Sequence, residues 1–259
     1  NQLNTKVLML THKGIAGQLG YRGLLAAYSI RSFGVDNLMD REDEYSELFS
    51  TIEKLSSFYD EKQFGHFVEL LKSSGVRIDR HSKKSELAAT MESLNALRLT
   101  QPFQSVLNFA VEKGLCRKTQ RIKDLEDLVA GDDDSESAAK KRTFYNALMA
   151  VPYREIIAFE QFREEQTPFS TKHGVKGAEY ENVLVIVDDR LWNQYNFESV
   201  VAGNVSKTQY ARSRNLFYVC CSRPKNDLAV LFLSPITAPA LSSAAILFGG
   251  AGVTSTMSL

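Results

Sequence analysis

The sequence is poor in cysteine and carries no net charge. Its three cysteines, Cys116, Cys220 and Cys221, have neither a metal-ligand spacing nor the pattern of a disulfide framework. The four histidines are too scattered to form a zinc site, so we expect no bound metal. The 31 basic residues balance the 31 acidic ones. Bulk charge therefore gives no support for nucleic-acid binding, although a local basic groove stays open.

The sequence also lacks the patterns of a targeting signal and of a clear membrane span. Residues 1–5 lead directly into an apolar run, without the features of a signal peptide. Residues 236–253 are apolar but barely long enough to cross a bilayer, and their serines and prolines disfavour insertion. We therefore expect a cytoplasmic protein without membrane contact, in which this stretch is a surface tail or a partly packed end of a domain.

A Walker A phosphate-binding loop is absent as well. Gly14, Gly17 and Gly20 recur at every third position after an apolar strand pattern at residues 6–10. The Gly-Lys-Ser/Thr ending that such a loop requires does not follow them. We interpret this segment as a turn from a strand into a helix, with backbone amides at the helix N-terminus.

The middle of the chain has a helical pattern from about residue 40 to residue 163. Tyr45, Leu48, Ile52 and Leu55 follow helical spacing and predict core packing. The acidic run at residues 131–136 predicts a solvated loop that caps a following helix at residues 137–149. Another helix is expected at residues 154–163, so this part of the chain is predicted to be all-helical.

Strand patterns return after the helical block. Residues 169–171 and 183–187 are expected strands, and the second shows little alternation, which is typical of a central parallel strand buried on both faces. A helix is expected at residues 207–218 and a last strand at residues 228–233. Strands and helices thus alternate at both ends, which predicts one α/β domain split by an insertion. We place the α/β domain at residues 1–40 and 165–259 and the insertion at residues 41–164.

One motif precedes the strand expected at residues 183–187 and reads Thr-x-His-x-x-Lys-Gly-x-Glu-aromatic. A loop that leaves a parallel strand at its carboxyl end faces the ligand crevice of such sheets, so we expect a ligand there. Hydroxyl and imidazole groups can donate hydrogen bonds to DNA phosphates without reading base sequence, and glycine lets backbone approach a ligand closely. The motif is filled by Thr171, His173, Lys176, Gly177, Glu179 and Tyr180.

A second motif reads Arg-x-Leu-x-Tyr-Val-x-x-Ser/Thr-Arg and overlaps the helix expected at residues 207–218. We interpret Leu216, Tyr218 and Val219 as packing residues. The planar guanidinium of Arg223 suits the charge that develops on a transferring γ-phosphoryl group. Pro224 follows directly and predicts an early helix end with a small shift of Arg223. The motif is filled by Arg214, Leu216, Tyr218, Val219, Ser222 and Arg223.

Together the motifs resemble two motifs of the second motor domain of UvrD/Rep-type superfamily 1 helicases, which couple ATP hydrolysis to movement along single-stranded DNA. The resemblance covers about residues 5–35 and 165–235, with Pro224 where the family usually has alanine. It implies an α/β fold: a RecA-like parallel-sheet domain of the P-loop NTPase type, the second motor domain (2A), interrupted by an all-helical insertion. The insertion resembles domain 2B, which in that family rotates as a unit and contacts duplex DNA or partner proteins.

The resemblance also implies roles for individual residues. Arg223 would be the arginine finger, and Glu179 would reach the ribose hydroxyls of the nucleotide beside Gly177. Thr171 and His173 would contact DNA. Lys176 would belong with the DNA-binding residues and would pair with a phosphate or with an acidic residue inside the motor.

The first strand carries the weakest correspondence. The family usually has an arginine just after this strand, near the γ-phosphate, whereas His12 and Lys13 stand here. Lys13 can act there as a point charge but cannot make the bidentate contact of arginine.

The sequence therefore resembles the C-terminal half of an ATP-dependent DNA helicase. ATP with Mg²⁺ would lie between this half and a first motor domain that supplies the P-loop lysine, the magnesium-binding acid and the base that orients water. These motifs are missing from the sequence, so we predict that the chain alone hydrolyses ATP negligibly. Expected partners are single-stranded or partly duplex DNA, the first motor domain and a protein bound by the insertion. The alternative is an inactive helicase-like scaffold or DNA-binding module.

Overall fold

The computed structural model describes residues 5–9, 12–74, 81–164, 169–170, 178–189, 195–206 and 208–254. The chain divides into two compact units, one formed by Asn1–Ile15 with Thr167–Leu259 and the other by Ala16–Gln166. We call the first the sheet unit and the second the helical unit. Segments from before and after the helical unit in the sequence thus contribute to the sheet unit.

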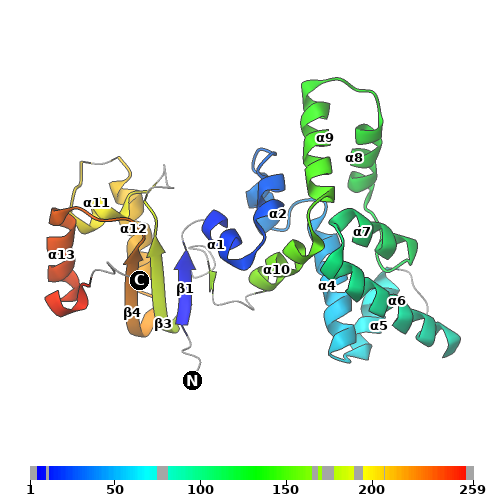
Figure 1. Cartoon of the computed structure of the whole chain (residues 1–259), viewed down its shortest axis with the longest axis horizontal. Coiled ribbons are helices and arrows are strands. Elements are labelled where there is room, and N and C mark those ends of the chain that lie inside the picture. Colours follow the sequence, from blue (N-terminus) through cyan, green and yellow to red (C-terminus); the bar gives the residue numbers. More distant parts are fainter. Residues whose placement is uncertain are drawn as a thin grey trace. The chain divides into compact units, whose positions relative to one another are not determined.

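The sheet unit is built on four parallel strands in the order β2-β1-β3-β4. Figure 1 shows β1, β3 and β4 side by side. Each of the four strand patterns predicted from the sequence is present, and β3 occupies a central position. The strands are β1 (Thr5–Met9), β2 (Phe169–Ser170), β3 (Tyr180–Val187) and β4 (Pro224–Phe232).

The two faces of β3 are buried to different extents. Val183, Val185 and Val187 are buried on one face, whereas Leu184 and Ile186 on the other are half-buried. The prediction of a strand buried on both faces is therefore correct for the valine face and wrong for the other. The valine face is covered by residues that follow β3 in the chain, including Phe197, Leu216 and Cys220.

The helices after β3 complete the sheet unit. Asp189 accepts hydrogen bonds from the backbone N–H groups of Phe197 and Glu198 at 2.9 and 2.8 Å, which caps the first of these helices. α1 begins in the sheet unit and continues into the helical unit. The helices are α1 (His12–Leu19), α11 (Phe197–Val201), α12 (Tyr210–Cys221), α13 (Ala238–Phe248) and the 3-10 helix η1 (Gly250–Gly252).

The apolar C-terminal stretch forms a short helix that is partly packed. Ala240 and Ala244 of α13 are buried against Val201, while Leu241 and Ile246 are exposed. The structure thus supports the reading of a partly packed domain end. No helix in the described part of the chain is long and apolar enough to cross a membrane.

The helical unit is held by buried aromatic side chains. The ring of Phe103 lies edge-on to Tyr45 and Phe49, with centroids 5.7 and 5.1 Å apart, and Tyr153 packs beside it. The stripe predicted from Tyr45 to Leu55 is buried throughout. The helices are α2 (Arg22–Tyr28), α3 (Gly34–Met39), α4 (Ser46–Asp60), α5 (Phe64–Ser73), α6 (His81–Thr100), α7 (Phe103–Glu112), α8 (Gln120–Ala130), α9 (Glu136–Met149) and α10 (Tyr153–Arg163).

The acidic run forms the predicted solvated loop and helix cap. It joins α8 to α9, which lie side by side in Figure 1. Asp133 accepts a hydrogen bond from the backbone N–H of Ser135 at 2.9 Å, and the Ser135 hydroxyl accepts one from the N–H of Ala138 at 3.2 Å. Ser135 is therefore the N-cap, and α9 begins one residue before the predicted start.

The division between the units differs from the predicted limit at residue 40. Residues 16–40 belong to the helical unit. The ring of Tyr28 lies edge-on to Phe144 of α9, and its hydroxyl donates to Asp43 at 2.7 Å. The backbone N–H of Leu24 donates to Glu155 of α10 at 3.0 Å. α2 buries its apolar side against these helices, which places the segment with them.

Candidate nucleotide site

Glu179 and Arg223 lie at one corner of the sheet. Tyr180 and Pro224 pair at the start of β3 and β4, so the residue before each is brought to the same place. The backbone N–H of Tyr180 donates to the carbonyl of Arg223 at 3.0 Å. Nη1 of Arg223 donates in turn to the carbonyl of Ala178 at 3.4 Å. Two residues 44 positions apart in sequence thus share one corner.

The guanidinium of Arg223 is fixed at one nitrogen and loosely held at the other two. Nε donates to the carbonyl of Val219 at 2.9 Å, while Nη2 contacts the Ser222 hydroxyl at 3.1 Å and the Nη1 contact is longer still. The residue is half-buried. The Nε bond sets the direction of the side chain, and the two terminal nitrogens can exchange weak contacts for an anion.

Pro224 positions Arg223 between two elements. α12 ends at Cys221 and β4 begins at Pro224, which leaves a connection of two residues, Ser222 and Arg223. Proline is accepted at the first residue of a strand because its missing N–H is not required there. The short connection holds Arg223 at the sheet corner.

Glu179 is exposed and weakly paired. Its carboxylate lies 3.7 Å from Nζ of Lys225, and the two side chains are 66% and 51% exposed. Such an ion pair contributes little, because water screens both charges. Glu179 is therefore available as a hydrogen-bond acceptor for a ligand.

The corner lies at the amino ends of the strands, whereas the sequence predicted a ligand at their carboxyl ends. The general rule for parallel sheets places ligands at the carboxyl ends. Glu179 and Arg223 instead come directly before β3 and β4. β3 has eight residues, so at about 3.3 Å per residue the two edges lie about 23 Å apart. Glu179 and Arg223 lie at the amino edge because each motif ends directly before the strand that follows it, β3 or β4.

Lys13 does not share this corner. It is the second residue of α1, which follows β1, and its side chain is exposed. Met9 at the end of β1 pairs with Ile186 near the end of β3. Lys13 therefore lies near the carboxyl edge, opposite Glu179 and Arg223.

Four further candidates lie outside the described residues. Thr171 follows directly after β2, whose last residue is Ser170. The four are Thr171, His173, Lys176 and Gly177.

Tyr218 is on the surface, contrary to the prediction that it packs in the core. Its side chain is 71% exposed, whereas Leu216 and Cys220 are buried and Val219 is half-buried. Tyr218 lies two residues from both Leu216 and Cys220, about 200° around the helix axis from each. Helical periodicity could have predicted the exposure of Tyr218. When positions 216 and 220 are buried, residue 218 lies on the opposite side of the helix.

At the opposite edge of the sheet, Asp189 has a structural role. Burial raises the pKa of its carboxyl group, and the N–H bonds that it accepts from α11 oppose that rise. Its two oxygens are used in capping α11. Within the described residues, no three His, Cys, Asp or Glu side chains are grouped closely enough to hold a metal ion.

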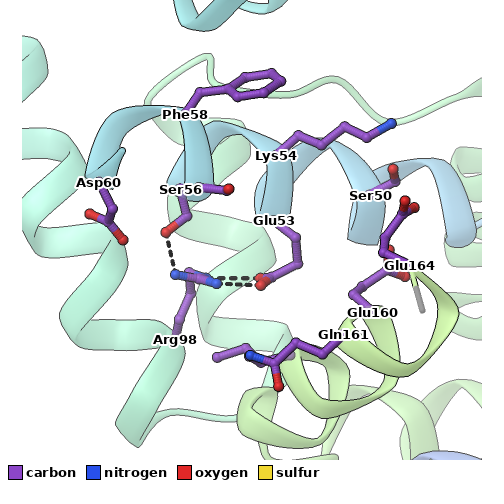
Figure 2. Close-up of a pocket in the computed structure, with 12 residues that line it drawn as sticks. Ser50, Glu53, Lys54, Ser56, Phe58, Asp60, Arg98, Glu160, Gln161 and Glu164 are labelled. Carbon is purple, nitrogen blue, oxygen red and sulfur yellow. Dashed lines mark hydrogen bonds and ion pairs between the residues drawn. The ribbon is translucent and has the colours of Figure 1, made fainter. Parts of the chain in front are cut away.

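The helical unit contains an open pocket of about 310 Å³ between α4, α6 and α10. Figure 2 shows Arg98 pointing toward Glu53 and Ser56 of α4. Nε of Arg98 donates to Glu53 at 2.9 Å, and Nη1 donates to the Ser56 hydroxyl. The strongest charges on the pocket wall are thus already paired with each other, which indicates a structural network.

Glu160 on the same pocket wall is buried beside another arginine. Its carboxylate accepts from Nη2 of Arg163 at 2.6 Å, and both side chains are 6% exposed. Burial raises the pKa of Glu160 to about 7, although Arg163 acts in the opposite direction. This carboxyl group therefore titrates near neutrality inside the helical unit.

Comparison with known proteins gives two matches. The family model for the UvrD-like helicase C-terminal domain matches residues 26–234. The Gabija protein GajB of Bacillus cereus (strain HuB5-5) is 32% identical to the chain over 84 residues. The match covers 29% of this chain and 12% of GajB, so the chain corresponds to a small part of that relative's length.

Proposed function

The chain belongs to the family of UvrD-like helicase C-terminal domains, and we propose on this premise that it is the C-terminal motor half of an ATP-dependent DNA helicase or translocase. In this proposal the sheet unit is the RecA-like second motor domain, 2A, and the helical unit is the 2B-like insertion. The observation that carries the proposal is the shared corner of Glu179 and Arg223. A protein that acts on ATP and DNA in this way would work in the cytoplasm.

Arg223 is the arginine finger of this proposal. Its Nε is anchored on the carbonyl of Val219, while Nη2 bonds to the Ser222 hydroxyl at 3.1 Å and Nη1 makes a long contact of 3.4 Å with the carbonyl of Ala178. A half-buried, directed guanidinium suits the charge that develops on a γ-phosphoryl group during transfer. The two-residue link between α12 and β4 would keep it in place through the reaction.

Glu179 and Gly177 bind the nucleotide next to the finger. The exposed carboxylate of Glu179 can accept hydrogen bonds from the ribose hydroxyls. Gly177, two residues earlier, would let backbone come close to the ligand. Lys13 lies at the other edge of the sheet, so the geometry gives no support for its contact with the same nucleotide.

ATP with Mg²⁺ requires groups from another domain. The sequence has no Gly-Lys-Ser/Thr loop. At the described corner, the exposed carboxylate beside Arg223 is that of Glu179, which is assigned to the ribose. A first motor domain would supply the P-loop lysine, the magnesium ligands and the base that orients water. The chain alone should therefore hydrolyse ATP negligibly.

DNA contacts are assigned to residues that follow β2 in the sequence. Thr171 and His173 would donate to phosphates, and Lys176 would pair with a phosphate or with an acidic residue of the motor. Replacing both Thr171 and His173 by alanine should weaken single-strand binding similarly for all sequences. A loss confined to one base sequence would contradict phosphate contact. The helical unit would contact duplex DNA or a partner protein.

Arg223→Ala tests the central assignment in a protein that joins this chain to its P-loop domain. DNA-stimulated ATP turnover should fall by roughly a thousandfold or more, because the charge on the transferred group is no longer stabilised. Arg223→Lys should restore little, since an ammonium group lacks the planar fork. Arg212→Ala is the matched control, an exposed arginine on α12, and it should leave turnover intact.

An inactive scaffold or DNA-binding module is the second candidate. The hydrogen bonds of Arg223 to Val219 and Ala178 would also suit an arginine that only joins α12 to β3. In that case Arg223→Ala would lower the thermal stability of the sheet unit and leave DNA-stimulated turnover unchanged. That outcome would end the arginine-finger assignment.

A further inference from the structure

We propose that Ser222 is a positioning residue for Arg223: its hydroxyl holds the guanidinium group in the orientation that a transferring phosphoryl group requires. The inference rests on the proposed function and deepens it at the same corner of the sheet. Ser222 makes no contact with the nucleotide in this proposal and acts through the side chain that follows it.

The end of α12 leaves a carbonyl oxygen for side chains to use. In a continued helix, the carbonyl of Val219 would accept the backbone N–H of residue 223. α12 ends at Cys221, and Pro224 disfavours helical geometry for Arg223 before it. The Val219 carbonyl instead accepts from Nε of Arg223 at 2.9 Å and from the hydroxyl of Ser222 at 3.1 Å. One oxygen thus anchors both side chains.

The three groups form a closed ring of hydrogen bonds. A serine hydroxyl has one proton and two acceptor lone pairs. Because the Ser222 proton is donated to the Val219 carbonyl, the oxygen is left as an acceptor for Arg223, and Nη2 donates to it at 3.1 Å. Each group in the ring therefore has the polarity that its neighbour requires.

Two bonds hold a planar group more firmly than one. With the Nε bond alone, the guanidinium plane of Arg223 could turn about the axis of that bond. The bond from Nη2 to Ser222 fixes a second point of the plane and opposes this turn. The remaining contact, from Nη1 to the carbonyl of Ala178, is 3.4 Å long and constrains the plane weakly. The hydroxyl of Ser222 is therefore the second fixed point of the guanidinium.

The arrangement leaves donors for a ligand. A guanidinium group has five N–H groups. The contacts of Arg223 with described residues use one N–H on each of its three nitrogens, which leaves one on each terminal nitrogen. Two such groups form the fork that binds two oxygens of a phosphate. The orientation of the guanidinium plane thus decides whether this fork meets the phosphoryl group.

A purely structural role is the competing explanation. A serine near a helix end can bond to the carbonyl three residues before it. Ser73 does so at the end of α5, where its hydroxyl donates to the carbonyl of Leu70 at 2.6 Å. Ser73 and Ser222 are both exposed, but the hydroxyl of Ser222 also accepts from a guanidinium. Ser73→Ala is therefore the matched control.

The test uses the protein that joins this chain to its P-loop domain. Ser222→Ala, Ser222→Thr, Arg223→Ala and the double variant Ser222→Ala with Arg223→Ala are compared with Ser73→Ala. The readouts are kcat at saturating DNA, the KM for ATP and the thermal unfolding midpoint. The double variant separates the two explanations, because a residue that acts only through Arg223 has no effect once that side chain is gone.

Ser222→Ala should lower kcat by about tenfold and leave the KM for ATP within about twofold, because a misdirected guanidinium weakens binding of the transition state alone. Ser222→Thr keeps the hydroxyl and should retain most of the activity. Ser73→Ala should stay within about twofold of the wild type, and the double variant should match Arg223→Ala. If Ser222→Ala lowers the unfolding midpoint more than Ser73→Ala does, Ser222→Thr compared with Ser222→Val decides, because these two side chains share a shape and differ in the hydroxyl.

Two results would overturn the inference. One is normal kcat in Ser222→Ala while Arg223→Ala is inactive, which would remove the positioning role and leave the proposed function intact. The other is a further loss of turnover when Ser222→Ala is added to Arg223→Ala, which would make Ser222 an independent structural residue. Full activity of Arg223→Ala would instead defeat the proposed function itself.

Discussion

The two units differ in the ion pairs that they bury, although the helical unit also carries exposed pairs such as Lys140 with Glu136. In the helical unit, Arg98 pairs with Glu53, and Arg163 pairs with Glu160, inside the protein. In the sheet unit, Glu179 and Lys225 form a loose pair at 3.7 Å in water. Buried pairs pay for desolvation and then hold helices in one arrangement, whereas exposed charges stay free to meet a ligand. The difference suggests that the helical unit is built around structure and the sheet corner around binding.

Aromatic side chains do not separate the two units in this way. Phe103, Tyr45 and Tyr153 are fully buried in the helical unit, but Phe33 of the same unit is 76% exposed. In the sheet unit, Phe197 is fully buried and Tyr218 is 71% exposed. Singly exposed rings are common on protein surfaces, so the contrast between the units rests on their charged pairs.

The largest effect on stability is expected from breaking a buried pair of the helical unit. Arg98→Ala leaves Glu53, which is 14% exposed, without its partner. Loss of one member of such a pair destabilises by about 3–5 kcal/mol. Urea unfolding followed by circular dichroism measures this change.

Removing both charges of that pair is the control. Arg98→Met combined with Glu53→Leu keeps volume without charge, and it should recover most of the lost free energy of unfolding. If Arg98→Ala costs less than about 1 kcal/mol, the pair behaves like a surface pair and the contrast between the units fails.

A second effect concerns the buried Glu160. Its pKa in the folded protein, about 7, lies above the ordinary value of 4.5. The folded state therefore binds the extra proton, and this contribution to stability is present at low pH and is lost as the pH rises through 7. Between pH 5 and pH 8 the free energy of unfolding of the wild type should fall by about 1–3 kcal/mol relative to Glu160→Gln. Parallel pH profiles of the two proteins would contradict this.

The sequence predicted those features that depend on local pattern. The apolar spacing from Tyr45 to Leu55 predicted a buried helix face, and the run at residues 183–187 predicted a central strand. The acidic loop predicted a cap that Ser135 provides. Each of these follows from the period of helices and strands or from capping chemistry, which a short segment contains in full.

The predictions that failed have two different causes. α2 lies in the helical unit because α9 and α10, more than 100 residues later, cover its apolar side. Local propensity cannot supply such contacts. The other two errors concern local signals: β3 and β4 begin directly after Glu179 and Arg223, and the helical period turns Tyr218 outward.

A smaller effect is expected at the start of α9. Ser135→Ala removes the hydroxyl that accepts from the N–H of Ala138 at 3.2 Å. It should destabilise the helical unit by about 1 kcal/mol, the usual cost of a lost N-cap. Ser137→Ala is the control, since Ser137 is exposed in the first turn and does not cap the helix. Equal unfolding midpoints for both variants would mean that the loop is held by other contacts.

The smallest effect is expected at the sheet corner. Lys225→Ala removes the loose partner of Glu179, and because both side chains are mostly in water the free energy of unfolding should change by less than about 1 kcal/mol. The same variant should leave the KM for ATP within about twofold, whereas Glu179→Ala should raise it about tenfold through loss of the ribose contact. A stability loss from Lys225→Ala as large as that of Arg98→Ala would mean that the corner is held by its own charges. Glu179 would then be a structural residue, and the contrast between a binding corner and a structural helical unit would no longer hold.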